Sequence, residues 1–211
     1  MQSKAKISAW VKYLTLIIIT LVTFGCDPDV SNQQLMQAAK TYLNQNKLRE
    51  AALELRNVLQ KSPNNAEARY LLGTINLNIG DTASAEKEFR HAANAGWQES
   101  AARIGQARAM LNSNAFQTML DEIDIKDSYS TSSQADLYAL RALAQAGLKN
   151  MNHAIKTLEK ATEIDADSFH VLKSTIQIHM ANNNIENANS SLEKALAMHP
   201  KNQEILFQML Q

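Results

Sequence analysis

The sequence predicts an all-α fold: a right-handed superhelical solenoid of about five helix pairs, followed by a short terminal helix. Small residues recur along the chain at Ala51, Ala85, Ala154 and Ala188. Their spacings are 34, 69 and 34 residues, so the repeat has a period of about 34 residues with one inserted residue. Each small residue lies in the second of two amphipathic segments, and Pro63 and Pro200 mark the ends of two such pairs. Units of this size stack on their neighbours to bury a continuous core.

The first two units are predicted at residues 32–65 and 66–97. In the first, apolar residues at i, i+3, i+4 and i+7 indicate a helix. Ser31 and Gln34 form the sequence pattern of a capping box, which satisfies free amides at a helix start. Pro63 ends the second helix of the first unit, because proline cannot continue a helix.

A degenerate third unit is predicted at residues 98–133. Its first helix keeps the apolar positions Ile104, Ala107 and Met110. The following segment turns polar and carries no proline stop, so residues 127–133 are expected to form a loop that inserts or distorts between the two halves of the solenoid.

Two further regular units are predicted at residues 135–168 and 169–202, and a short terminal helix at residues 203–211. The terminal segment is apolar over most of its length. Because solenoids usually close with a helix that is polar on its outer face, this segment either docks flat on the fifth unit or marks a shortened relative of a longer array.

These small and apolar positions resemble the tetratricopeptide repeat over nearly all of residues 32–202. In three units the glycine at the turn between the helices is replaced, by Asn46, Lys149 and Asn183. The resemblance implies that the first helix of each unit lines a concave groove, which binds extended peptides or partner helices. The residues expected to face this groove are Met36, Lys40, Leu43, Tyr70, Thr74, Leu77, Ala139, Leu143, Lys173, Gln177 and Met180.

Residues 1–25 are predicted to form a signal peptide. They begin with a region that contains three lysines and no acidic residue, and Tyr13 to Phe24 follow without a charge. This apolar run has the length typical of a signal peptide. It is short for a bilayer span, which needs about 20 residues. An uncleaved anchor extended back through Lys12 is the alternative, because a lysine side chain can reach the interface.

The residues from Val22 to Cys26 resemble the lipobox of bacterial lipoproteins. The resemblance implies lipidation of Cys26, the only cysteine of the chain, and cleavage just before it. Residues 26–30 would then be a lipidated tether and residues 31–211 the repeat domain. The expected location is the cell envelope of a Gram-negative bacterium, lipid-anchored and facing the periplasm. Asp27 resembles the signal that retains lipoproteins in the inner membrane of enteric bacteria.

The chain lacks the patterns of nucleic-acid binding and catalysis. Its 21 Lys+Arg residues balance 21 Asp+Glu residues, and no basic cluster marks a nucleic-acid footprint. The five histidines are scattered without a ligand spacing. The acidic stretch from Asp121 to Asp127 lacks the glycine of a calcium loop. We therefore expect no enzyme activity, cofactor, metal or small-molecule substrate, and a protein as the partner.

The lipobox, the repeats and the degenerate third unit together resemble the N-terminal region of the tetratricopeptide lipoproteins of the PEP-CTERM/exosortase system. That resemblance implies a protein-binding scaffold of the cell envelope, linked to exopolysaccharide and surface-protein assembly. A pilotin-like lipoprotein that assists type IV pilus or secretin assembly is an alternative. An enzyme with an atypical site in the third unit is an alternative of another class.

Overall fold

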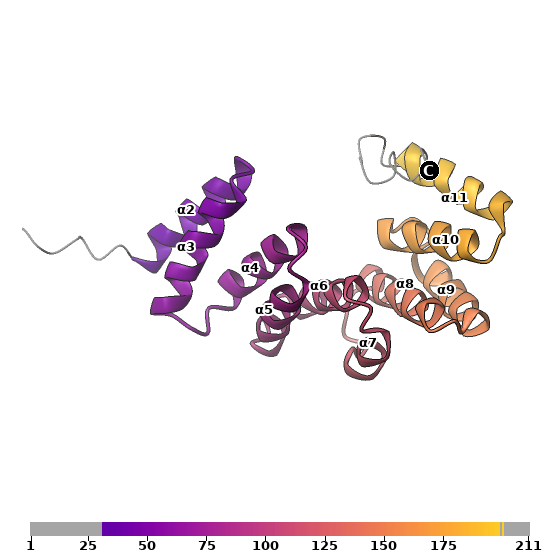
Figure 1. The fold of residues 1–211 in the computed structure, drawn as a ribbon, viewed down its shortest axis with the longest axis horizontal. Coiled ribbons are helices and arrows are strands. Elements are labelled where there is room, and N and C mark those ends of the chain that lie inside the picture. Colours follow the sequence, from indigo (N-terminus) through magenta and orange to yellow (C-terminus); the bar gives the residue numbers. More distant parts are fainter. Residues whose placement is uncertain (1–30, 199, 201–211) are drawn as a thin grey trace, which may run out of the picture.

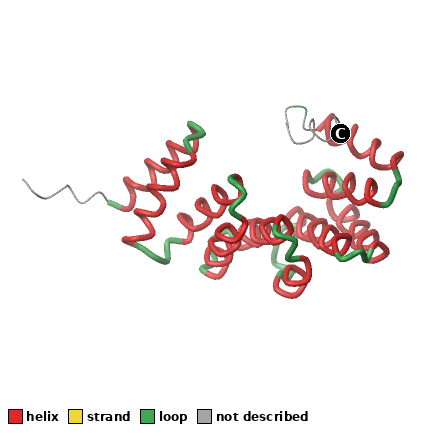
Figure 2. The backbone as a smooth tube through the Cα atoms, viewed as in Figure 1, coloured by secondary structure: helices red, strands yellow, loops and turns green. Residues whose placement is uncertain are grey.

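The computed structural model describes residues 31–198 and 200, and these residues form ten α-helices and no strand (Figures 1 and 2). The helix pairs are α2 (Asn32–Asn44) with α3 (Leu48–Lys61), α4 (Ala66–Asn78) with α5 (Thr82–Asn94), α6 (Glu99–Asn112) with α7 (Phe116–Glu122), α8 (Thr131–Gly147) with α9 (Met151–Asp165), and α10 (Phe169–Ala181) with α11 (Ile185–Met198). The predicted all-α solenoid is confirmed. The residues of the predicted signal peptide, Cys26 and the residues of the predicted terminal helix at 203–211 lie outside the described residues.

The pairs stack into a curved array (Figure 1). Helices α4, α6, α8 and α10 follow the inner side of the curve, and α5, α7 and α9 follow the outer side. The two helices of each pair contact each other, and each helix from α3 to α9 also contacts the first helix of the next unit. The core is therefore a series of small apolar clusters rather than one central mass.

The capping box at the first described helix is present in the structure. The Ser31 hydroxyl accepts a hydrogen bond from the Gln34 amide at 3.2 Å, and the Gln34 side chain accepts one from the Ser31 amide at 2.9 Å. Asn46, Lys149 and Asn183 have φ values of 56°, 62° and 56°, the left-handed conformation that favours glycine. They therefore take the turn position of a glycine, as predicted.

The repeating small residues lie where the two helices of a pair cross. Ala51, Ala85 and Ala154 have no exposed surface, and Ala188 is buried as well. One turn further on, Leu55, Phe89, Ile123 and Leu158 are buried at matching repeat positions. Small side chains let the helices approach, and the larger ones fill the space between neighbouring units.

Phe89 shows how close this packing is in the second unit. Its ring lies between α4 and α6, against two glycines. A methyl group on Gly73 would lie 3.1 Å from the ring, and one on Gly105 would lie 2.6 Å from it. Because interiors are packed at crystal-like density, these glycines are needed to make room for an aromatic ring.

The third unit departs from the pattern in its second helix, which has only 7 residues. Met119 occupies the position of the repeating alanine, and Lys126 falls where the second unit has Ala92. A methionine cannot permit the close crossing that alanine permits, and a lysine cannot continue the buried stripe. The helix ends at Glu122, although Ile123 keeps the buried repeat position.

The loop after α7 runs from 123 to 130, so the predicted loop at 127–133 is wrong for its last three residues. The Ser130 side chain accepts a hydrogen bond from the Ser133 amide and thereby starts α8 at Thr131. A serine cap begins a helix because it satisfies an otherwise free amide. The sequence pattern of this polar stretch did not reveal which of its serines is the cap.

Polar side chains hold this loop in place of the missing helical turns. Arg141 donates to the carbonyl oxygens of Leu120 and Ile123, at 3.2 and 3.3 Å, and so satisfies acceptors at the end of α7. Lys126 Nζ lies 2.5 Å from Glu99 Oε1. This contact lowers the pKa of the Glu99 carboxyl, chiefly through the hydrogen bond from Lys126. The third unit is thus distorted but ordered by specific contacts.

Candidate partner-binding groove

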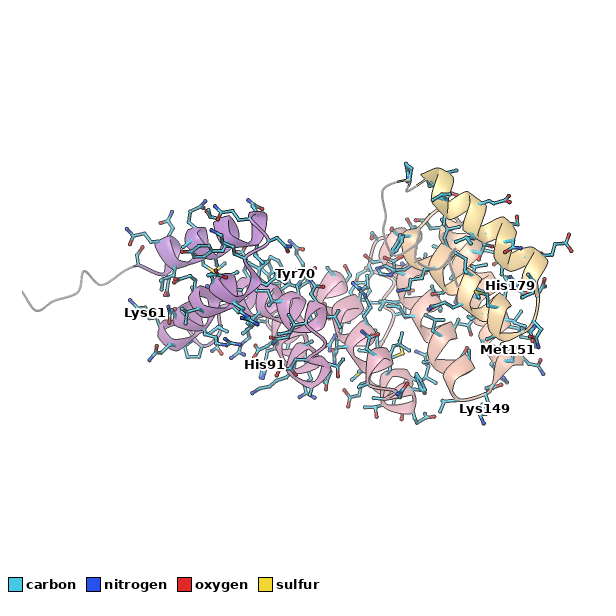
Figure 3. The ribbon with its side chains drawn as sticks, turned by 45° about the horizontal axis from the view of Figure 1, so that its top comes forward. Lys61, Tyr70, His91, Lys149, Met151 and His179 are labelled. Atoms are coloured by element: carbon cyan, nitrogen blue, oxygen red, sulfur yellow. The ribbon has the colours of Figure 1, made fainter. Side chains whose placement is uncertain are left out.

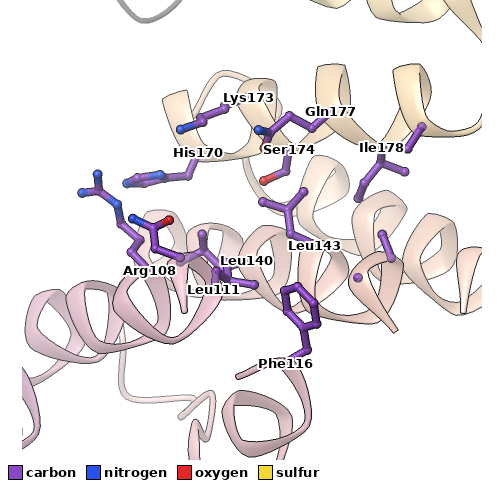
Figure 4. A pocket seen from close by; sticks show the side chains of 14 residues that line it. Arg108, Leu111, Phe116, Leu140, Leu143, His170, Lys173, Ser174, Gln177 and Ile178 are labelled. Atoms are coloured by element: carbon purple, nitrogen blue, oxygen red, sulfur yellow. The ribbon is translucent and has the colours of Figure 1, made fainter. Parts of the chain in front are cut away.

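A cavity of about 490 Å³ opens beside the third unit, between α6, α8 and α10 (Figure 4). These are the first helices of three consecutive units, and they lie on the inner side of the curve (Figure 1). We call this cavity the α6–α8–α10 groove. Its lining residues are Arg108, Leu111, Asn112, Phe116, Leu140, Leu143, Ala146, Gly147, His170, Lys173, Ser174, Gln177, Ile178 and Ala181.

Phe116, at the start of the short helix α7, borders the groove. Its ring packs on Gly147 at the end of α8, where an added methyl group would lie 2.6 Å from the ring. Phe116 is only partly buried, unlike Phe89 in the second unit. The degenerate unit therefore contributes an aromatic side chain to the groove.

The groove has two chemically different ends (Figure 4). Arg108, His170 and Lys173 lie at one end, while Phe116, Leu143 and other aliphatic side chains lie toward the other. No aspartate or glutamate is among the described residues that line it. The side of the groove that can bind a charged group is therefore basic.

One carboxyl group lies near this basic end without lining the groove. Asp136, on the second turn of α8, accepts a hydrogen bond from the Ser168 hydroxyl, which also caps α10. Burial raises the pKa of the Asp136 carboxyl, and the Ser168 hydrogen bond and the charge of Arg108 oppose that rise. The contact joins the fourth unit to the fifth and fixes the position of α10 beside α8.

Three of the predicted groove residues, Leu143, Lys173 and Gln177, line the α6–α8–α10 groove. Met36 and Lys40 line a separate, shallower cavity of about 340 Å³ between α2 and the start of α4. There the Lys40 ammonium pairs with the Glu67 carboxylate at 2.9 Å. The structure therefore does not bring the predicted residues together into one continuous site.

The other predicted residues divide between packing and exposure. Tyr70 packs against Phe89 and Trp97, with ring centroids 5.5 and 4.7 Å apart. The Thr74 hydroxyl donates to the Tyr70 carbonyl at 3.0 Å. The remaining four are Leu43, partly buried against the core of the first unit, Leu77, buried in the core, Ala139, fully buried, and Met180, exposed.

Ala139 needs a correction, because it has no exposed surface and cannot contact a partner. It packs in a cluster with Ala161 and Val171. The short alanine side chain is covered by these neighbours and does not reach the inner surface. Met36 and Leu77 are also buried and offer little surface to a partner.

The sequence analysis did not include Arg108 and Leu111 among the groove residues, although the 34-residue spacing places both in the rows of residues that it did include. Arg108 follows Lys40 and Thr74 at the same 34-residue spacing, and the same row continues to Leu143 and Gln177 after the one-residue insertion. The third unit supplied no candidate because its second helix looked degenerate. Its first helix, α6, is regular over 14 residues and holds its side chains in the repeat register.

No other candidate site emerges from the described residues. Within residues 31–198 and 200, no three His, Cys, Asp or Glu side chains are grouped to hold a metal ion. His91 on α5 and His179 on α10 lie in different parts of the molecule (Figure 3). Asp121 accepts a hydrogen bond from Gln117 at the exposed surface of α7. Among the same described residues, every helix is too short or too polar to cross a membrane.

Comparison with known families identifies the repeat. Residues 36–101 and residues 135–168 match two family models, both described as the tetratricopeptide repeat. The first match covers the first two units and enters the third, and the second covers the fourth unit. These two stretches of the chain are therefore tetratricopeptide repeats. No curated protein matches it.

Solved structures share the fold at low sequence identity. A thermophilic tetratricopeptide protein of Thermus thermophilus has a TM-score of 0.64 and 15% identity, over 84% of this chain and 96% of that one. PilF of Pseudomonas aeruginosa has a TM-score of 0.60 and 15% identity, over 83% and 79% of the two chains. YrrB, described as a tetratricopeptide protein with an unusual peptide-binding site, has a TM-score of 0.55 and 16% identity, over 88% and 95%. These likenesses establish the tetratricopeptide solenoid.

Proposed function

We propose that this tetratricopeptide-repeat chain is a lipid-anchored scaffold of the bacterial cell envelope, and that its α6–α8–α10 groove binds a protein partner. The observation that carries the proposal is the groove itself. Three consecutive first helices present an apolar floor, at Leu111, Leu140 and Leu143, beside polar and basic side chains. Concave, mostly apolar sites with a few placed polar groups are the usual form of binding sites.

The dimensions of the groove favour a chain segment over a compact small molecule. Packed helices lie about 8 to 10 Å apart, so crossing from α6 through α8 to α10 covers about 16 to 20 Å. An extended chain rises about 3.3 Å per residue, so about five or six residues would bridge the three helices. YrrB, which shares this fold, is described as having a peptide-binding site.

The membrane part of the proposal is supported by the sequence alone. A basic start, an apolar run and Gly25 directly before Cys26 fit a lipoprotein signal. Two acyl chains are enough for stable anchoring, so the repeat domain needs no other membrane element.

A paired set of variants tests the groove. In the full chain, Leu143→Asp places a charge on the apolar floor of the groove. Leu53→Asp, at an exposed position of α3, is the matched control. Leu143→Asp should remove the proteins that co-purify with the wild type and are identified by mass spectrometry, whereas Leu53→Asp should retain them. Far-ultraviolet circular dichroism checks that both variants remain helical. Equal capture by the two variants would place the binding surface elsewhere.

A labelling experiment tests the anchor. Cys26→Ser should abolish incorporation of labelled palmitate and leave an unprocessed precursor, because the thiol is the proposed acceptor of the lipid. Labelling at the wild-type level in that variant would contradict the lipoprotein assignment without affecting the groove.

A second candidate is assistance to type IV pilus or secretin assembly. PilW, described as a type IV pilus biogenesis factor, has the same fold over 79% of this chain and favours it. The identity of the partner lost in Leu143→Asp separates the two roles. A secretin or pilus protein would support the second candidate, and a protein of exopolysaccharide or exosortase-linked assembly would support the first.

A further inference from the structure

A buried hydroxyl on one wall of the groove indicates the chemistry of its occupant. We propose that the α6–α8–α10 groove selects a partner segment that inserts a tyrosine. The tyrosine ring would pack against Leu143 and Phe116, and its hydroxyl would form a hydrogen bond with the hydroxyl of Ser174. This inference rests on the proposed function and specifies the partner.

The side chain that carries the inference is Ser174, in the middle of α10. It lines the groove although only 1% of its surface is exposed, so it lies at the bottom of the cavity. Hydroxyl groups within a helix often bond to the backbone carbonyl one turn earlier. The neighbouring Thr175 does so, donating to the Val171 carbonyl at 2.8 Å. The Ser174 hydroxyl makes no hydrogen bond with any residue that the structure describes, and its oxygen is directed away from α10, on the side that faces α6 and α8 (Figure 4).

An occupant that covers Ser174 must therefore offer it a hydrogen bond. A ligand group that displaces solvent from a polar atom loses affinity when it cannot replace the solvent's hydrogen bonds. A leucine or phenylalanine seated on this wall would leave the Ser174 hydroxyl buried and unpaired, which costs more than the hydrogen bond itself contributes. Sites that bury a polar group in this way reject analogues that lack the matching polar atom.

The surroundings of Ser174 determine the rest of the inserted side chain. The groove around it is lined by aliphatic side chains, among them Leu140, Leu143 and Ile178, and by the ring of Phe116 (Figure 4). No aspartate or glutamate is among the described residues of the lining, so the tip of a lysine or arginine would find no carboxylate there. A serine or threonine has too small an apolar part to fill a cavity of about 490 Å³. Tyrosine combines a large apolar ring with one hydroxyl that needs a partner when it is buried.

Peptide selection on the full chain tests the inference, because tyrosine and phenylalanine differ by a single oxygen. A random peptide library is selected in parallel on the wild type, on Ser174→Ala, on Leu143→Asp and on a control, Thr175→Val. The control removes the neighbouring hydroxyl, which bonds to the helix backbone. Fluorescence polarisation then measures binding of the enriched peptides and of copies in which tyrosine is replaced by phenylalanine. Alanine favours a helix more than serine does, so Ser174→Ala should stay folded, and circular dichroism checks this.

The wild type and Thr175→Val should both enrich peptides that contain a tyrosine. They should bind the phenylalanine copies about tenfold more weakly, because each copy leaves the Ser174 hydroxyl unpaired. In Ser174→Ala this preference should disappear or reverse, since the tyrosine hydroxyl is then the group without a partner. A preference for tyrosine that persists at about tenfold in Ser174→Ala would show that the hydroxyl binds elsewhere, and it would overturn the inference.

The variant Leu143→Asp separates this inference from the function on which it rests. Peptides that lose binding in Leu143→Asp but prefer leucine, phenylalanine or tryptophan would overturn the tyrosine and leave a peptide-binding groove. Failure of the wild type to enrich any peptide would overturn both. Tighter binding of a synthetic peptide of residues 203–211, which contain no tyrosine, than of any enriched peptide would overturn an external partner. The groove would then belong to the chain's own C-terminal segment or to that of a second copy.

Discussion

The second and third units of the solenoid begin alike and end differently. Both have a regular first helix, α4 or α6, with buried residues in the same register. The second unit continues with 13 residues of α5, and Phe89 on that helix is enclosed between two glycines. The third unit continues with the 7 residues of α7 and a loop held by Arg141 and Lys126.

Two substitutions in the repeat account for this difference. Ala85 stands at the close helix crossing of the second unit, and Met119 takes that position in the third unit. Lys126 of the third unit takes the position of the buried Ala92. The unit loses helical turns on the outer side of the curve, and Phe116 is left at the groove on the inner side. The degenerate repeat thus places an aromatic ring at the groove, whereas the regular repeat encloses its aromatic ring in the core.

The largest expected contrast is between the two phenylalanines. Phe89→Ala should lower the free energy of unfolding by about 3 to 5 kcal/mol, because it empties an enclosed site in the core. Phe116→Ala should cost clearly less, because its ring is only partly buried. Guanidinium unfolding followed by circular dichroism measures both, and equal losses would mean that the third unit packs as tightly as the second.

The small-residue positions give the next effect. Ala85→Leu and Ala154→Leu should each destabilise the fold by about 1 to 3 kcal/mol, because they overpack a helix crossing. Met119→Leu, at the same repeat position in the third unit, should cost less than about 1.5 kcal/mol because it conserves volume. Thermal melts compare the three, and unchanged stability in both alanine variants would show that the repeat register is wrong.

A smaller contrast is expected between one glycine beside each ring, Gly105 beside Phe89 and Gly147 beside Phe116. Gly105→Ala brings a methyl group against the enclosed Phe89, and the gain in helix propensity offsets part of the strain, which leaves a net loss of about 1 kcal/mol. Gly147→Ala meets the Phe116 ring at the same 2.6 Å, but that ring borders an open groove and can move aside. It should be neutral, or stabilising by up to about 1 kcal/mol. If Gly147→Ala destabilised the fold as much as Gly105→Ala does, the ring of Phe116 could not border an open groove.

The smallest effect concerns the loop of the third unit. The Lys126 hydrogen bond lowers the pKa of Glu99, so this contact stabilises the folded state at neutral pH. Its contribution should be lost as the pH falls from the ordinary pKa of a glutamate through the lowered value. The melting temperature of Glu99→Gln should therefore depend less on pH in this acidic range than that of the wild type. Parallel profiles would show that the ion pair is fully screened by water.

Periodicity in the sequence was enough to predict the helix pairs, the core alanines and the three non-glycine turns, because each follows from local backbone and packing rules. The end of α7 was not predictable in this way, since it depends on how Met119 fits against α6 and on hydrogen bonds from Arg141, far along the chain. The burial of Ala139 was missed because a repeat register gives the position of a residue but not how completely its neighbours cover a side chain as short as alanine. Arg108 was in register and was overlooked with the rest of its unit.

Photo-cross-linking on the inner surface tests the central claim most directly, that the partner binds beside the degenerate unit. Gln177 and Lys40 occupy the same row of the repeat, and both are exposed. Gln177 lines the α6–α8–α10 groove, whereas Lys40 lies in the cavity of the first unit. A photo-reactive amino acid placed at each position of the full chain in cells should give a covalent protein adduct at 177 and little at 40. Equal yields at the two positions, or a higher yield at Lys156 on the outer helix α9, would contradict the account.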